Sequence, residues 1–184
     1  MKNSVTAIAL TASIMMLSAC GSDGDAVTEG AAETAAATND WDATDACALL
    51  DKAAVGAALN DPVTETSLAF VNQASGPNAA TSECTYRLTS GGTATLMARR
   101  SPIADNTPEA IAIARKGTQE TLAAFGDATV EDVDGLGKAA FYVPRVSQMN
   151  VFIDDDKFVI LTLGTAPAAT AKATAVELVG KIGA

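Results

Sequence analysis

A short apolar run at the N-terminus constrains this chain more than any other feature. Residues 5–17 follow a start with one positive charge, Lys2, and their only polar members are Thr6, Thr11 and Ser13. The run is too short for a membrane-spanning helix, which needs roughly 20 apolar residues. A positive charge before a short apolar core is typical of a secretory signal. We therefore expect residues 1–19 to be a signal peptide, and the rest of the chain to fold after export.

The apolar run ends in Leu17-Ser18-Ala19-Cys20. This segment resembles the lipobox of bacterial lipoproteins, which consists of Leu, two small residues and Cys. The resemblance implies diacylation of the Cys20 thiol, cleavage before Cys20 and acylation of the new amino group. Several acyl chains are needed because one chain alone anchors a protein only marginally. The alternative is an ordinary cleaved signal with an incidental Cys.

The implied location is therefore the bacterial cell envelope, with the membrane bound through the lipid on Cys20. Gly21, rather than Asp, follows this cysteine. In a cell with two membranes, the resemblance then implies sorting to the outer membrane, on its periplasmic face.

Residues 20–44 are predicted to be the lipidated Cys followed by a flexible acidic tether. Between positions 21 and 45 the chain has seven acidic residues and no basic residue. Such a composition cannot bury enough apolar surface to offset the chain entropy lost on folding, and its like charges keep the segment extended. The Ala-rich stretch 31–37 is the one place where a weak helix is the alternative.

Residues 45–184 are long enough for a single globular domain. Caps and periodicity predict two short helices, three strands, a long helix, four strands and a last helix. Their ranges are 47–50, 52–59, 66–71, 83–88, 93–99, 108–125, 129–133, 139–143, 149–153, 158–163 and 167–182. Short turns join most neighbouring strands, which predicts a mainly antiparallel sheet covered by the two longer helices, an α+β fold. Strand 158–163 is apolar on both faces and is predicted to be central.

Both longer helices carry an apolar stripe with a spacing of three or four residues. The stripe of the first consists of Ile111, Ala114, Thr118, Leu122 and Phe125. The stripe of the second consists of Ala171, Ala175, Leu178, Val179 and Ile182. We expect both stripes to face the sheet.

Two cysteines, Cys47 and Cys84, remain if Cys20 carries lipid. An even pair in an exported chain predicts a structural disulfide. The alternatives are a redox pair or a metal site, although the chain has no Cys-x-x-Cys motif and no His to complete a set of metal ligands.

A second resemblance covers residues 45–184. It rests on three segments, 45–50 (DACALL), 84–86 (CTY) and 133–142 (VDGLGKAAFY). Together they are similar to small secreted lipoproteins of unknown function that are common in actinobacteria. The resemblance implies a disulfide between the two cysteines and a PsbP-like α/β/α sandwich, and it supplies no catalytic residue.

Charge and composition disfavour several classes of function. The formal net charge of −10 repels phosphate backbones, so we expect no nucleic-acid partner. The absence of His excludes Ser-His-Asp and Cys-His nucleophile pairs. The Gly137-Lys138 pair lacks the Gly and the Ser or Thr of a phosphate loop, because Asp132 and Ala139 occupy those positions. We therefore predict no enzyme, no cofactor and no metal site, and an enzyme that uses carboxylates alone is the minor alternative.

Two clusters of charged residues could either bind a ligand or be ordinary surface charges. Asp154, Asp155 and Asp156 either coordinate a hard cation or form a solvated hairpin tip, and the tip is favoured. Arg99, Arg100 and Arg145 either form an anion-binding patch or are surface charges that only keep the protein soluble, and the second interpretation is again favoured.

Two hypotheses for the function follow from these features. The first is a non-catalytic protein-interaction or accessory module of the envelope, which predicts an exposed apolar patch or sheet edge and a protein partner. The second is a carrier of a small ligand, with a pocket between sheet and helix lined by Phe70, Phe141, Tyr142 and Met149 and with Arg145 as a further ligand-binding candidate. The same apolar residues fit a plain core. The interaction module is the favoured hypothesis.

Overall fold

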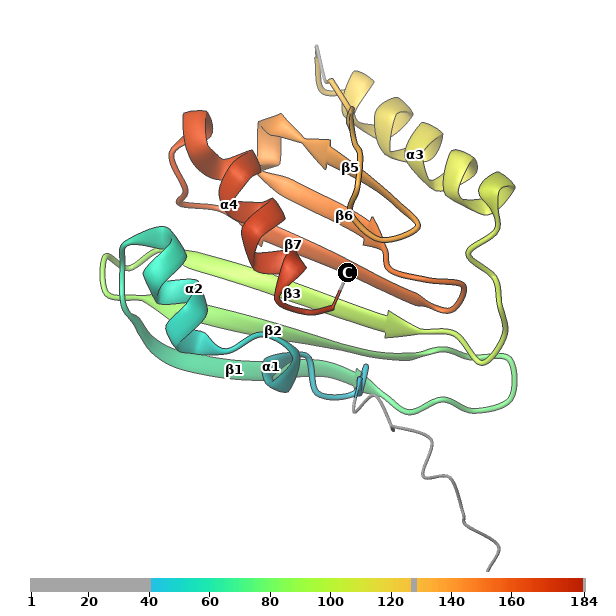
Figure 1. Ribbon diagram of the computed structural model, residues 1–184, viewed down its shortest axis with the longest axis horizontal. Helices are drawn as coiled ribbons and strands as arrows, with labels where there is room; N and C mark the ends of the chain where they lie inside the picture. Colours follow the sequence, from blue (N-terminus) through green and yellow to red (C-terminus); the bar gives the residue numbers. More distant parts are fainter. Residues whose placement is uncertain (1–40, 127–128, 184) are drawn as a thin grey trace, which may run out of the picture. The chain divides into compact units, whose positions relative to one another are not determined.

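A computed structural model describes residues 41–126 and 129–183 of the chain (Figure 1). It confirms the α+β class and the predicted order of helices and strands, with one added 3₁₀ turn, η1. The elements are α1 (Ala46–Leu49), α2 (Lys52–Leu59), β1 (Val63–Asn72), β2 (Ala80–Leu88), β3 (Thr93–Arg100), α3 (Pro108–Ala123), β4 (Glu131–Val133), β5 (Ala139–Val143), η1 (Pro144–Val146), β6 (Gln148–Phe152), β7 (Lys157–Leu163) and α4 (Ala168–Gly180).

The strands form one antiparallel sheet in the order β1-β2-β3-β7-β6-β5-β4. The apolar strand β7 is at its centre, as predicted. The two edges differ in length, because β4 has three residues and β1 has ten. In Figure 1, β1 is the lowest strand of the sheet.

One face of the sheet packs against α1, α2 and α4 and forms the larger core. Its strand residues include Tyr86, Leu96 and Leu161, all fully buried. The predicted stripe of the last helix is buried, although the helix ends at Gly180 and Ile182 lies just past it: Ala171, Ala175, Leu178, Val179 and Ile182. Trp41 and Ala43 also belong to this core.

The burial of Trp41 and Ala43 moves the start of the folded part. Residues 41–44 lie in the globular unit and not in the tether predicted for 20–44. The acidic, alanine-rich composition of the tether continues to Asp45, so composition alone does not indicate that the Trp41 side chain packs into the core. The signal peptide, Cys20 and the rest of the tether lie outside the described residues.

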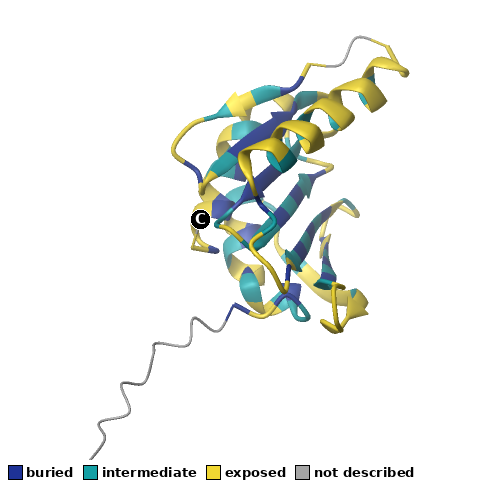
Figure 2. Ribbon diagram, turned by 90° about the vertical axis from the view of Figure 1, so that its right-hand side faces the viewer, coloured by how far each residue is buried: buried dark blue, intermediate teal, exposed yellow. Residues whose placement is uncertain are grey.

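The opposite face carries α3. Ile111 and Leu122 of this helix pack against a smaller cluster formed by Val130, Phe141, Val143 and Phe152. None of the residues of α3 is fully buried, and Figure 2 shows it as a largely exposed helix. The predicted stripe is therefore correct only in part. Ala114 is exposed, and Phe125 lies beyond the end of the helix with 70% of its surface exposed.

Three alternating residues of β2 fasten the N-terminal segment to the sheet. The Ser82 hydroxyl accepts a hydrogen bond from the Ala46 N–H (2.8 Å) and donates one to the Ala43 carbonyl (2.8 Å). Cys84 forms the predicted disulfide with Cys47, with 4.9 Å between the Cα atoms. The Tyr86 hydroxyl donates to the Leu50 carbonyl (2.8 Å), and burial, with a smaller contribution from Asp51, raises the pKa of that hydroxyl.

The disulfide is expected to supply a large part of the stability. Replacing both Cys47 and Cys84 with Ala should lower the free energy of unfolding by about 3–4 kcal/mol, because the unfolded chain regains the entropy of a long loop. Urea denaturation followed by circular dichroism measures this change. The wild-type chain under reducing conditions is the control and should match the double variant. A loss below about 1 kcal/mol would contradict the assignment.

Candidate functional site at the outer edge of β1

The residues predicted to line a carrier pocket do not come together. Tyr142 and Met149 are buried in the larger core, on the α4 side of the sheet. Phe141 is buried in the smaller cluster under α3, on the opposite face. Phe70 lies on β1 with 74% of its surface exposed. Adjacent residues of a strand point to opposite faces, so Phe141 and Tyr142 cannot line one pocket.

The three arginines do not form a shared anion site either. Arg99 forms an ion pair with Asp105, and Arg100 forms one with Asp156 (3.1 Å). Arg145 lies in η1, between β5 and β6, and donates to the Phe125 carbonyl (2.7 Å). It is therefore separated from the other two arginines, which lie at the end of β3.

The three aspartates at the β6–β7 turn each pair with a different cation. Asp154 accepts from Lys157 (2.7 Å), Asp155 from Lys138 (2.5 Å) and Asp156 from Arg100. Among the residues that the structure describes, no group of three or more acidic or Cys side chains is placed to hold a metal ion. The carboxylates diverge, as expected for a hairpin tip.

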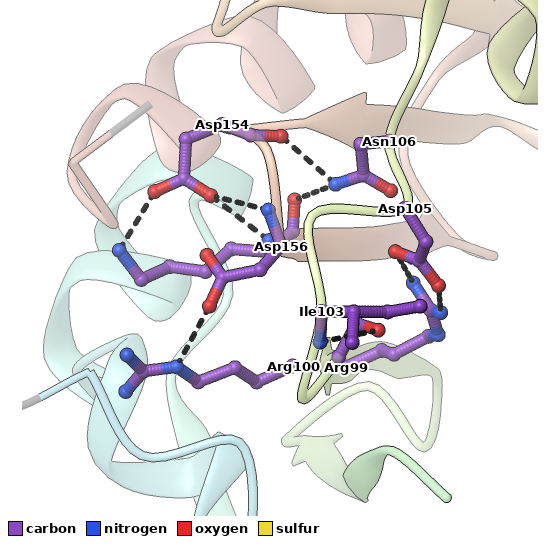
Figure 3. Close-up of polar contacts among 9 residues, drawn as sticks. Arg99, Arg100, Ile103, Asp105, Asn106, Asp154 and Asp156 are labelled. Carbon is purple, nitrogen blue, oxygen red and sulfur yellow. Dashed lines mark hydrogen bonds and ion pairs between the residues drawn. The ribbon is translucent and has the colours of Figure 1, made fainter. Parts of the chain in front are cut away.

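This turn is fixed to the segment between β3 and α3 (Figure 3). The Asn106 side-chain amide donates to the carbonyls of Asp154 and Lys157, both at 2.9 Å. Partial burial alone raises the pKa of Asp154. Hydrogen bonds from the Lys157 side chain and from the backbone N–H groups of Asp156 and Lys157 outweigh that effect and hold the pKa at about 2. The cluster thus has a structural explanation.

The outer edge of β1 carries exposed apolar side chains that have no role in the core or in the charged clusters. Eight of the ten residues of β1 are exposed. Leu68, Phe70 and Val71 expose 42%, 74% and 47% of their surfaces, so three large apolar side chains gather within four positions. Residues 66–72 carry no charge. Natural edge strands are usually protected by charged side chains, especially Lys, or by prolines, bulges or short length, and between Val63 and Asn72 only the bulges and the single charge of Glu65 are present.

Two bulges divide β1. Thr64 is an extra residue between the pairs Val63–Leu88 and Glu65–Arg87, and two residues, Phe70 and Val71, oppose Ser82. Phe70 has a φ of +52°, in the left-handed region that a bulky residue rarely occupies. Such a conformation costs about 1–2 kcal/mol, and the exposed ring gains little burial in return. The strand is therefore strained where it presents its largest apolar side chain.

A groove of about 500 Å³ lies at the other end of β1, between its first residue and α2. Its lining residues are Lys52, Ala53, Gly56, Ala57, Asn60, Asp61, Pro62 and Val63. Asp51 caps α2 at its start, accepting from the N–H groups of Ala53 and Ala54.

The turn that follows α2 fixes this groove. Asn60 ends the helix in the left-handed conformation, and its N–H donates to the carbonyls of Ala57 and Gly56. A Cβ atom at Gly56 would lie 3.2 Å from the Val63 nitrogen, so the missing side chain permits this close approach of helix and strand. Ala53, Gly56 and Ala57 leave the groove open and make its helix side apolar, whereas Lys52, Asn60 and Asp61 add polar groups to its lining.

The edge and the groove together have the features that strand addition by an extended polypeptide segment requires. The outer edge of β1 offers backbone donors and acceptors for strand addition, the groove offers an apolar subsite, and residues 66–72 bring no charge that would have to be desolvated. Sequence reasoning did not single out Leu68, Val71 or the groove. The neutral run at 66–72 was visible, but nothing local shows that its strand lies at an edge.

Comparison of the chain with protein-family models, with curated proteins and with solved structures finds no match. No helix within the described ranges is long and apolar enough to span a membrane.

The strained bulge gives a testable expectation. Phe70→Asn should leave the free energy of unfolding unchanged or raise it by up to about 1 kcal/mol, because Asn adopts a positive φ more readily and little buried surface is lost. Urea denaturation measures the change, at a protein concentration low enough that copies of the chain do not associate, since association would add to the apparent stability. Leu68→Asn, on the same strand without a positive φ, is the control and should give no gain. A loss above about 1 kcal/mol for Phe70→Asn would show that the ring supports the fold.

Proposed function

We propose that the protein is a lipid-anchored lipoprotein of the bacterial cell envelope, and that its domain is a non-catalytic interaction module that docks protein segments at the β1 edge. The observation that carries the docking role is the group of Leu68, Phe70 and Val71 at the outer edge of β1. Among the described residues this edge pairs with no further strand, and positions 66–72 carry no charge. An exposed, strained Phe adds nothing to a monomer, and strain of this kind is found at binding sites.

The anchoring role is supported by the lipobox-like segment that ends at Cys20 and by the oxidised pair of cysteines. Disulfides persist in exported proteins and are rare in the cytosol. The proposal places the protein on the periplasmic face of the outer membrane if the cell has two membranes. The presence of helices on both faces of the sheet supports a further proposal, that the arrangement is PsbP-like.

The anchor is tested by replacing the cysteine. Cys20→Ser should move the protein from the membrane fraction to the soluble fraction, because the acyl chains that hold it are lost. Fractionation and immunoblotting measure the distribution. Ser22→Ala, two residues further on, is the matched control and should stay with the membrane. If the Cys20→Ser protein also stays there, the anchoring proposal fails.

The docking role is tested with a photo-crosslinking amino acid in living cells. Placed at Phe70 or at Ser67, it should give a discrete adduct, because both positions lie on the β1 edge. Placed at Ile113 of α3, which is exposed to 64%, it should give none. Gel mobility and mass spectrometry identify the adducts. Equal adducts from all three positions, or none from β1, would contradict the proposal.

A further inference from the structure

We propose that the segment docked at the β1 edge is β1 of a second copy of this chain, so that two sheets join across a two-fold axis at Ser67. This inference rests on the proposed function and names its partner. Three features of β1 carry it: the spacing of its bulges, the positions of its apolar patch and groove, and the distribution of its charge.

The regular part of β1 is symmetric about Ser67. Residues 65–69 pair one to one with β2, and Ser67 is their middle residue. The extra residues Thr64 and Phe70 lie three positions before and three positions after it. In an antiparallel pair centred on Ser67, Thr64 of one copy faces Phe70 of the other. Each irregularity then meets the other, and the ladder between them stays in register.

The apolar patch and the groove lie at opposite ends of the same strand. Phe70 and Val71 oppose Ser82, and Val63, which lines the groove, opposes Leu88. Ser82 and Leu88 are both buried and lie an even number of positions apart on β2, so they point to the same, helix-covered face of the sheet. The patch and the groove therefore lie on one side of β1.

The two-fold axis brings patch and groove together twice. Pairing about Ser67 places Val71 of one copy opposite Val63 of the other, and Phe70 next to the groove that Ala53, Gly56 and Ala57 line. An isologous contact of this kind is self-complementary: each copy gives an apolar patch and receives one. The groove thereby gains the large side chain that its own small residues leave room for.

Charge is compatible with the same arrangement. In the paired strands Glu65 faces Ala69 of the other copy, and the two Glu65 side chains lie about 13 Å apart along the strand direction. Within its own chain Glu65 pairs with Arg87 (3.6 Å). No like charges face each other across residues 65–69. Because the contact is apolar and made by backbone hydrogen bonds, it should change little between low and high salt.

A single cysteine at the axis tests the pairing. Ser67→Cys in the full-length chain, produced in its own envelope, should give an interchain disulfide, because directly opposite Cα atoms lie about 4.5–5.5 Å apart. Most of the chain should run as a dimer on a non-reducing gel. Glu65→Cys is the matched control on the same strand, and its two copies lie too far apart to join. Equal dimer from both variants, or none from Ser67→Cys, would overturn the inference.

A second measurement keeps the inference testable if the Ser67→Cys variant fails to fold. Sedimentation velocity of the wild-type chain in detergent should show a dimer. Phe70→Asp should raise the dissociation constant of this dimer at least tenfold, while the circular dichroism spectrum is unchanged. A wild-type monomer at every concentration would overturn the inference. If a crosslinker at Phe70 then captures a different envelope protein, the docking role stands without self-pairing, and if β1 gives no adduct at all, both fail.

Discussion

The attachment of residues 43–50 to β2 is the constraint on which the rest of the domain depends. Ser82, Cys84 and Tyr86 bind this segment with hydrogen bonds and a disulfide. They hold α1 against the sheet, and only two residues separate α1 from α2, so the position of α2 beside the start of β1 follows. In the part of the chain that the structure describes, the helices therefore cover the inner part of this face and leave the outer edge of β1 exposed.

An edge of this kind has a physical consequence for the protein. Within the described residues, the outward-facing backbone groups of β1 have no strand partner. Together with three exposed apolar side chains and no lysine, they form an association surface unless something covers them. Phe70 is a second unfavourable feature of this edge, because its backbone adopts a strained conformation while its large ring stays exposed. A strand that pairs with β1 would satisfy its outward-facing backbone groups and bury the Phe70 ring, and this burial would offset the cost of the strained backbone.

Local rules predicted much of the fold. Asp45, Asp51 and Thr107 cap the first three helices with the short polar side chains that favour helix starts. The doubly apolar strand β7 is central because such a strand needs cover on both faces. The stripe of α3 fails at Phe125 because burial depends on what lies opposite, and α3 covers only one end of the sheet. The candidate site escaped prediction for a similar reason. The order of strands in the sheet is set by long-range pairing, so no pattern within residues 63–72 shows that they form an edge. The alternation of strand residues, in contrast, already argued against one pocket for Phe141 and Tyr142.

The central claim is that the β1 edge is covered in the assembled protein, and amide hydrogen exchange tests it most directly. The wild-type chain and Phe70→Asp should be compared at the same concentration, with α3 as the internal reference. The account predicts slower exchange across Val63–Asn72 in the wild type than in the variant, with no difference in Pro108–Ala123. The same exchange rates for β1 in both proteins would contradict it.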